Sequence, residues 1–516
     1  MAAFSLIDWA VCLGYLVIVF ALGLWFARGQ HSNEDYFLGG RRMHWLPIGL
    51  SLFAGTFSSL SFVGLPSTAA YGDYHLYLAI LFIPFVVSPI VWKFFLPIYF
   101  RLGVTSSYEY IEQRFDRRLR LVCSVLFMLY TIGWMGNMLR AVGVILEAVF
   151  DLSQMQTAGV LIGVGLFATV YTTLGGVKAV VWTDAIQAVA LGGGMLTVLI
   201  LAVGHIDGGW STVWQVGHEH GRFAMFDTSL SAEHGNLWAA TAFGMFVYLA
   251  GHAVHFGSVQ RYVSMPSQTA AGWALVVNGL MVGLVCGLFF LAGSTLFAFY
   301  QQQAEQRGSP METVSDVSVA APIIADTLYD ELKREKHQDQ LLPRFVMSEL
   351  SIPGLIGLLL AGLFAAAMSS IDSGINSMTA SVVCDWQSER QLELRHSRVL
   401  CCVFGLLSVA VAMVFYFKGG NVFPMIMKIA GMFFGLQLGL FLLGMSVKRA
   451  TSNTAMIGLT AGTIGLIMTF VFEIPHWWYG AITCVPTYLV GVMASYLMSS
   501  DDTSAGQTVA ASLDQP

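Results

Sequence analysis

The sequence predicts an all-α integral membrane protein with about thirteen transmembrane helices. Hydrophobic residues make up 56% of the 516-residue chain and charged residues only 11%, whereas soluble domains carry about 25% charged residues. The mean hydropathy is +0.69, and the apolar residues are gathered in long runs. The net charge of −6 is small and gives no reason to expect a nucleic-acid partner.

Thirteen apolar runs are long enough to cross a bilayer, which takes about 20 residues of helix. They are 6–27, 44–70, 76–100, 121–150, 157–175, 180–204, 236–260, 271–300, 352–380, 398–417, 421–447, 454–473 and 476–498. An extra N-terminal span with its cytoplasmic loop, 1–43, precedes a first group of five spans, 44–204. An extracellular loop, 205–235, leads to a second group of five, 236–447, which includes an extracellular loop at 301–351. Two further spans occupy 448–498, and the polar tail 499–516 is predicted to be disordered.

Lysine and arginine are distributed unevenly between the two sides of the predicted bundle. An odd number of spans places the termini on opposite sides. Alternate loops carry fifteen basic residues on one side, among them Arg117, Arg120 and Arg261, and seven on the other. Because short basic loops stay in the cytoplasm, we expect the N-terminus outside and the C-terminus in the cytoplasm of a multi-pass plasma membrane protein.

Two predicted spans contain polar interruptions at membrane depth. Span 44–70 contains FAGTFSSLSFVGLP (53–66), and span 236–260 contains YLAGHAVHFGS (248–258). Serine, threonine and glycine are poor helix formers and proline removes a backbone donor, and backbone freed in a membrane must face protein or a cavity. Close packing through small residues is the alternative. Because the two segments hold corresponding positions in the two groups of five spans, they indicate a transporter built from two inverted repeats.

Span 352–380 contains AAAMSSIDSGINS (365–377), which places an acid among hydroxyls. One face of this helix carries the polar residues Ser369, Asp372, Ser373, Asn376 and Ser377. An aspartate at a helix centre costs about 3 kcal/mol on insertion scales, so it needs a partner. The other acid deep in a predicted span is Asp184, near a cytoplasmic end, where an ordinary interfacial carboxylate is the alternative.

Hydroxyls, backbone carbonyls and carboxylates are hard oxygen ligands, which suit a small hard cation rather than zinc or copper. Asp372 could therefore hold a coupling cation. It could instead make a structural pair with Arg140 or Lys428, or it could carry a proton.

Five stretches resemble motifs of the sodium/solute symporter family, whose members transport glucose, inositol, iodide, monocarboxylates, vitamins, proline and sialic acid. They are DYFLGGRRMHWLPIGLSLFAGTFSS (35–59), TSSYEYIEQRFD (105–116), TLGGVKAVVWTDAIQ (173–187), VQRY (259–262) and LFAAAMSSIDSGINS (363–377). The resemblance implies the leucine-transporter fold, in which two inverted five-helix repeats follow an extra first helix. It also implies sodium-coupled symport of a small organic solute, such as a sugar or a monocarboxylate, into the cell by alternating access. Sodium is then the coupling ion, and no other cofactor is expected.

The resemblance implies two sodium sites as well. Carbonyls and hydroxyls of the first site correspond here to Ala54, Phe57, Ala366, Ser369 and Ser370. Some members bind a second sodium, and the matching residues are Asp184, Ser369, Asp372 and Ser373. Asp372 departs from the serine or threonine that is usual at its position. Two carboxylates around one cation could tighten this site, or one of them could stay protonated.

The family's solute lies at the bilayer centre beside the broken helices. The candidate solute-binding residues are Thr56, Ser58, Ser61, Trp134, Tyr248, His252, Asn278 and Gln437. Each could instead make an ordinary packing or interhelical hydrogen-bond contact. Sialic-acid members place an arginine where this chain has Trp134, and Arg140 lies about 240° further around the helix. Carboxylate binding in that mode is therefore doubtful, and Trp134 could instead stack on a flat solute face.

Other functional classes find less support in the sequence. No nucleophile–base motif, haem ligand pair or nucleotide-binding loop indicates an enzyme, and no repeated filter or charged ring indicates a channel. The seven cysteines show no metal-ligand spacing. The alternatives are a proton-coupled symporter that uses Asp372 and a solute sensor on a transporter fold. We expect the protein to act in the lipid bilayer as a monomer or weak oligomer.

Overall fold

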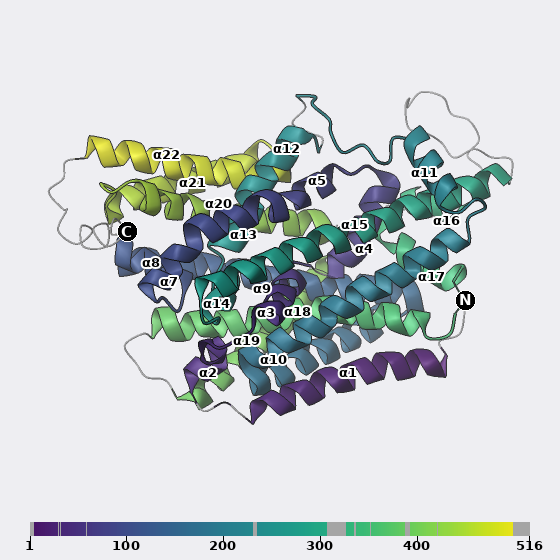
Figure 1. Cartoon of the computed structure of the whole chain (residues 1–516), viewed down its shortest axis with the longest axis horizontal. Helices are drawn as coiled ribbons and strands as arrows, with labels where there is room; N and C mark the ends of the chain where they lie inside the picture. Colours follow the sequence, from purple (N-terminus) through teal and green to yellow (C-terminus); the bar gives the residue numbers. More distant parts are fainter. Residues whose placement is uncertain are drawn as a thin grey trace.

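The computed structural model is helical throughout the residues that it describes, which are 5–28, 30, 32–57, 59–230, 235–306, 327–334, 337–350, 352–387, 393–419 and 422–498. Its long helices lie side by side in one bundle (Figure 1). In these residues nine helices are long and apolar enough to cross a membrane, or up to eleven if each of two bent pairs is one span. The prediction of an all-helical membrane protein is confirmed. The predicted tail 499–516 and part of the predicted loop, 307–326, lie outside the described residues.

The first predicted interruption is a bend between two helices. The axes of α3 (Trp45–Thr56) and of the Ser61–Tyr71 part of α4 (Ser59–Tyr71) meet at 61°. Helix α3 ends because Phe57 leaves the helical region, with φ −86° and ψ 128°, in a stretch of poor helix formers. Upstream, α1 (Leu6–Ala27) runs along the edge of the bundle and leads to the short α2 (Asn33–Leu38) (Figure 1).

The second interruption is also a bend. Helices α12 (Leu237–Phe243) and α13 (Leu249–Ala253) belong to one span, which meets α14 (Phe256–Val263) at 49°. Val254 and His255 separate the two parts, and His255 has extended backbone with ψ 128°. Both spans that the sequence singled out are therefore broken, and each break frees backbone groups that a continuous helix would use.

Helix α10 (Gln154–Gly204) covers two predicted spans, 157–175 and 180–204. Along a straight helix Tyr171 and Thr183 would lie about 18 Å apart, yet both reach the same oxygen of Asp372. The chain therefore turns back between them, at Gly176, where φ is 56° and ψ is −160°. Glycine is required there because the φ is positive and because a side chain would meet the Tyr36 carbonyl oxygen at 2.7 Å.

The remaining spans complete the bundle. One span from His75 to Leu102 consists of α5 (His75–Phe82), α6 (Ser88–Ile90) and α7 (Leu96–Leu102) joined by π-helical turns. The other long helices are α9 (Arg117–Phe150), α15 (Gln268–Gln306), α19 (Leu394–Lys418), α20 (Val422–Ser446), α21 (Ser452–Val471) and α22 (Tyr479–Leu497). The count falls below the predicted thirteen for two reasons. Helix α10 is counted once although the chain turns back at Gly176, and α20 qualifies only as a shorter apolar helix, Ala430–Ser446.

The predicted loops contain helices of their own. They are α8 (Ser107–Arg114), α11 (Trp210–Glu219), α16 (Leu328–Arg334) and α17 (Leu341–Ser348). Helices α2 and α8 lie at one end of the bundle, and α11 and α16 lie at the other (Figure 1). Helix α1 begins at the end that carries α11, and α22 finishes at the end that carries α8 (Figure 1). The described ends of the chain therefore lie at opposite ends of the bundle.

Helix α18 (Leu355–Ser381) occupies the centre of the bundle. In the span that contains α18, 94% of the residues of the most apolar stretch are buried. The same share is 22% for α1 and at most 50% for the other long apolar helices that the structure describes. Its neighbours are α1, α9, α10 and α19. The polar face predicted on this helix is therefore enclosed by protein, as an acid at membrane depth requires.

Candidate ion and solute sites

A cavity, here called the central cavity, lies between the two broken spans. Its volume is about 160 Å³, roughly ten times the space that one water molecule requires. Thr56 and Phe57 from the first break line it, together with His252 and His255 from the second. Helices α9, α15, α18 and α20 contribute further walls. The two breaks therefore face one space at the centre of the bundle.

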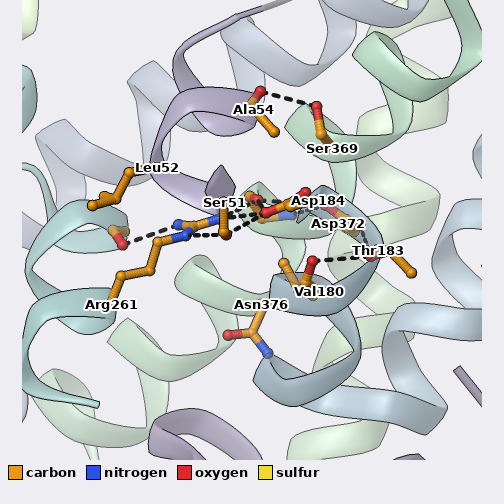
Figure 2. Close-up of polar contacts among 12 residues, drawn as sticks. Ser51, Leu52, Ala54, Val180, Thr183, Asp184, Arg261, Ser369, Asp372 and Asn376 are labelled. Atoms are coloured by element: carbon orange, nitrogen blue, oxygen red, sulfur yellow. Dashed lines mark hydrogen bonds and ion pairs between the residues drawn. The ribbon is translucent and has the colours of Figure 1, made fainter. Parts of the chain in front are cut away.

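The predicted ligands of a first sodium lie where α3 breaks against α18. The Ser369 hydroxyl is 3.1 Å from the carbonyl oxygens of both Ala54 and Ala366 (Figure 2). The Ser370 hydroxyl lies 3.4 Å from the Ala366 oxygen, and Ser370 and Phe57 both line the central cavity. All five residues are buried. Carbonyl and hydroxyl oxygens gathered in this way are ligands that suit a small hard cation.

The predicted ligands of a second cation form a cluster one turn further along α18. Asp372 Oδ2 accepts a hydrogen bond from the Tyr171 hydroxyl at 2.7 Å and lies 3.5 Å from the Thr183 hydroxyl. Its Oδ1 accepts from the Ser373 backbone N–H at 2.6 Å. The Ser373 hydroxyl lies 3.4 Å from Asp372 Oδ1 and 3.5 Å from Asp184 Oδ2. Two carboxylates, both 0% exposed, thus meet at one hydroxyl.

Arg261 joins this cluster, and the sequence analysis did not predict it there. Its guanidinium lies 3.1 Å from Asp184 Oδ2 and 2.6 Å from the Ser373 hydroxyl (Figure 2). It also donates at 2.7 Å to the Ser51 hydroxyl, which in turn donates at 2.5 Å to Asp184. The prediction that Arg261 lies in a cytoplasmic loop is wrong, because α14 carries it into the bundle, where it is 6% exposed.

Two features of the sequence could have identified Arg261. A buried aspartate needs a partner, and the motif VQRY (259–262) follows directly after the second interruption. Among the described residues, the partners of Asp372 are two hydroxyl groups and a backbone N–H. They take the place of the structural pair with Arg140 or Lys428 that the sequence also allowed.

With both carboxylates ionised, the cluster carries one net negative charge, since two carboxylates then face one guanidinium. Within the described residues, Asp184 Oδ1 is buried without a hydrogen-bond partner. A buried acceptor without a partner is costly, and uncompensated charge at membrane depth is costlier still. The arrangement therefore offers oxygen atoms of the kind that suit a small hard cation.

Five of the predicted solute residues line the central cavity, namely Thr56, Ser61, Trp134, Tyr248 and His252. Asn278 lies behind this wall, with its side-chain nitrogen 3.1 Å from His252 Nε2. Gln437 lies away from the cavity and donates at 3.0 Å to the Cys123 carbonyl oxygen. Ser58 lies outside the described residues.

The central cavity also has an aromatic wall that the sequence analysis did not single out. Tyr130 has its ring centroid 4.4 Å from Phe434, 5.6 Å from His255 and 5.7 Å from Trp134. His255 Nε2 is buried without a hydrogen-bond partner in the described part of the chain. The four-residue spacing of Tyr130 and Trp134 places them on one face of α9, but no local pattern reveals that Phe434 joins them from α20.

Two broken helices that enclose a cavity, with oxygen ligands for a cation in its wall, define the class of secondary transporters built on discontinuous membrane helices. The model of the sodium:solute symporter family matches residues 36–462. The chain therefore belongs to the sodium:solute symporter family, as its motifs predicted.

Relatives with established names are transporters too. Sodium/sialic acid symporter NanT of Aliivibrio fischeri is 28% identical over 97% of this chain and 95% of its own length. Human sodium-coupled monocarboxylate transporter 1 is 33% identical over 90% of this chain and 73% of its own length. The predicted function, sodium-coupled symport of a small organic solute across a membrane, is confirmed at the level of the family.

Solved structures agree with this assignment. A sodium-coupled sialic acid symporter in a substrate-bound, outward-open state matches with a TM-score of 0.83 and 28% identity, over 96% of this chain and 99% of that chain. A transporter of the nucleobase–cation symport family matches with a TM-score of 0.51 and 12% identity, over 91% of this chain and 97% of that chain, and shares the fold alone. The family and its relatives are transporters rather than enzymes.

Proposed function

We propose that this chain imports a small organic solute together with sodium by alternating access. One observation carries the proposal: Ser370 and Ser373, which belong to the two candidate cation sites, also line the central cavity. A cation bound to these serines changes the wall that the solute contacts, so each ligand alters the affinity for the other. Membership of the sodium:solute symporter family supports the same mechanism.

The first sodium is bound by the carbonyl oxygens of Ala54, Phe57 and Ala366 and by the hydroxyls of Ser369 and Ser370. The Ser369 hydroxyl lies 3.1 Å from two of these carbonyl oxygens, those of Ala54 and Ala366, and can donate to them. Sodium needs the same oxygens as ligands, so its binding replaces hydrogen bonds between α3 and α18 with coordination between them. The cation then links the broken helix to the central one.

The second cation is bound by Asp184, Ser369, Asp372 and Ser373. Arg261 already compensates much of the charge on Asp184, so Asp372 supplies the charge that attracts the ion. The single net negative charge of the cluster suits one monovalent cation. Binding removes the unpaired charge from the interior, which favours the occupied state.

The solute is a small sugar, monocarboxylate or similar molecule with one flat or apolar face. Trp134, Tyr130 and Phe434 offer aromatic surface to such a face, and the hydroxyls of the first break offer hydrogen bonds. The basic side chain among the described lining residues is Arg261, which pairs with Asp184. A carboxylate in this cavity would therefore be bound by hydroxyl, amide or imidazole groups. The names of the relatives, which cover sialic acid and monocarboxylates, support this range of solutes.

The organisation of the chain is proposed to be thirteen spans, with α10 counted as two and α20 as one. Residues 44–204 and 236–447 form the two inverted repeats, after the extra helix in 1–43 and before the two helices in 448–498. The N-terminus and the loops 205–235 and 301–351 lie outside, and the C-terminus lies in the cytoplasm of the plasma membrane. Basic residues in the loops of the proposed cytoplasmic side still outnumber those in the loops of the other side when Arg261 is left out of the count.

The test has two stages. A thermal-shift screen of the purified protein against sugars, sialic acids, monocarboxylates, polyols and amino acids, with and without sodium, identifies the solute, because a specific ligand stabilises the folded state. Uptake of that solute into proteoliposomes is then measured with an inward sodium gradient and with choline in its place. Uptake that requires sodium supports the proposal. A solute that binds but is not taken up would instead indicate a sensor.

Proton coupling is the second candidate, and the additional acid Asp372 is the observation that favours it. Two carboxylates that meet at the Ser373 hydroxyl with one arginine leave room for one of them to carry a proton. Uptake driven by an inward pH gradient in sodium-free buffer, and abolished by Asp372→Asn, would establish this alternative.

A further inference from the structure

We propose that Gln260 and Asn376 form the cytoplasmic gate of the central cavity, an inference that rests on the transport function proposed above. Gln260 Nε2 donates at 2.9 Å to the side-chain oxygen of Asn376 and at 2.9 Å to the Phe37 carbonyl oxygen. These two hydrogen bonds join α14, α18 and α2, and all three residues are buried. Neither amide side chain belongs to the candidate cation or solute sites.

A second cavity lies beyond this contact, at the end of the bundle that carries α2. Its volume is about 370 Å³, and its lining includes Phe37, Gln260, Ala380 and Cys384. The cavity is lined by α2, by α14 and by the far end of α18, which are the elements that the two hydrogen bonds connect. We call it the cytoplasmic cavity.

The layer between the two cavities is thin. On α18, Ser377 lines the central cavity and Ala380 lines the cytoplasmic cavity, a separation of about 4.5 Å along the helix axis. On α14, Gly257 lines the central cavity and Gln260 the cytoplasmic one. The layer is therefore about one helical turn thick on both helices, and the Gln260–Asn376 hydrogen bond crosses between the helices at this level.

The hydrogen bonds of Gln260 that close this layer are weak enough to break during a transport cycle. They join neutral groups, which bind more weakly than charged ones. The network is also incomplete, because within the described residues Asn376 Nδ2 is buried without a partner. A barrier that must open in every transport cycle requires such modest closure.

The gate also lies next to the cation cluster on both helices. Gln260 directly precedes Arg261 on α14, and Asn376 follows Ser373 by one turn on α18. The Arg261–Ser373 contact at 2.6 Å and the Gln260–Asn376 contact at 2.9 Å are thus consecutive links between the same two helices. A cation that binds at Asp184 and Asp372 alters the first link and thereby acts on the second.

Two native cysteines can report on the gate. Cys286 lines the central cavity and Cys384 lines the cytoplasmic cavity. The assay uses inside-out vesicles without solute or sodium and a membrane-impermeant maleimide. The reagent should label Cys384 and leave Cys286 unlabelled, and mass spectrometry of the two cysteine-containing peptides measures both reactions. Asn376→Ala should speed Cys286 labelling by about fivefold, the factor expected when one hydrogen bond is lost from the closed state. Gln260→Ala also removes the bond to the Phe37 carbonyl oxygen, so it should speed labelling by at least this factor. The rate at Cys384 should stay unchanged.

Gln301→Ala is the matched control, because Gln301 is also a buried amide, which donates at 3.0 Å to Glu305 towards the far end of α15. This variant should leave Cys286 protected. Ser377→Cys in a Cys286→Ser background provides a second reporter directly beside the layer. Protection of both reporters in both gate variants would overturn the proposal, and so would rapid labelling of Cys286 in the wild type. Because the assay needs no transport, its failure is distinct from a failure of sodium-coupled uptake.

Discussion

Two buried arginine–aspartate pairs in this chain differ in how completely the acid is bonded. Asp385 receives the Arg120 guanidinium at 2.8 Å and one serine hydroxyl at 2.7 Å on Oδ1, and a second serine hydroxyl at 2.7 Å on Oδ2. Asp184 receives the Arg261 guanidinium and two serine hydroxyls on one oxygen, while its Oδ1 has no partner among the described residues. Both oxygens of the first acid are thus bonded, whereas the second acid keeps one oxygen without a partner.

The acids next to the two arginines differ as well. Glu112 contacts Arg120, but its side chain is 32% exposed, so water stabilises its charge. Asp372 lies beside the Asp184 pair and is 0% exposed, so its charge requires a partner from within the bundle. The same residue types therefore make a structural contact in one place and a cation site in the other. What separates them is whether every oxygen is bonded and whether the extra charge reaches water.

The largest expected effect belongs to the complete pair. Asp385→Ala removes the fully buried partner of Arg120 and leaves only the half-buried Glu112 as its acid partner among the described residues, which should lower the free energy of unfolding by about 3 kcal/mol. Thermal unfolding of the purified variant measures this loss. The fraction of the Asp385→Ala variant that folds should keep the wild-type sodium requirement for uptake. A changed sodium requirement would contradict a purely structural role of the Arg120–Asp385 pair.

Asp372→Ala should affect the sodium requirement more than the stability, although it leaves the buried Tyr171 hydroxyl without its acceptor. The variant loses the charge that attracts the cation, an interaction of about 1.5–3 kcal/mol for a charged group. The sodium concentration for half-maximal uptake should therefore rise roughly tenfold to a hundredfold. Undiminished sodium-coupled uptake by Asp372→Ala would exclude Asp372 as an ion ligand.

Two serines of α18 provide a matched test of the comparison. Ser369→Ala removes a hydroxyl from both proposed sodium sites and should raise the sodium requirement about tenfold, since one ligand is worth about 1–1.5 kcal/mol. Ser381→Ala removes a donor from Asp385 and should cost a similar free energy of unfolding. Each variant should leave the other property unchanged, as measured by sodium titration of uptake and by thermal unfolding. If Ser369→Ala and Ser381→Ala raised the sodium requirement equally, the distinction between a cation site and a structural contact would not hold.

The smallest effect is expected from Glu112→Gln, which removes the charge of the half-buried acid beside Arg120. Because water already reaches the Glu112 carboxylate, the loss of its charge should cost about 1 kcal/mol or less. The melting temperature should therefore change little, and the sodium requirement should not change. A loss of stability as large as that of Asp385→Ala would show that solvent exposure does not separate the two acids.

Local patterns in the sequence were enough to predict several of these features. The apolar runs, the two interruptions and the polar face that carries Ser369, Asp372 and Asn376 follow from composition and helical spacing over fewer than thirty residues each. These features depend on neighbours in the chain, which is why they can be read before folding is considered. Family motifs added the pairing of Ala54 with the α18 serines, and the structure places the Ser369 hydroxyl 3.1 Å from the Ala54 carbonyl oxygen.

Only the tertiary structure decided which distant residues meet. Arg261 reaches Asp184 because the second break redirects α14 into the bundle, and Phe434 meets Tyr130 because α20 packs beside α9. The turn at Gly176 brings Tyr171 and Thr183 to one oxygen of Asp372. Contacts of this kind depend on how helices are placed against one another in space, and no periodicity along a single helix contains that information. The sequence by itself thus determined where polar groups enter the membrane, and the tertiary structure decided which of them are fully bonded and which are left to bind a cation.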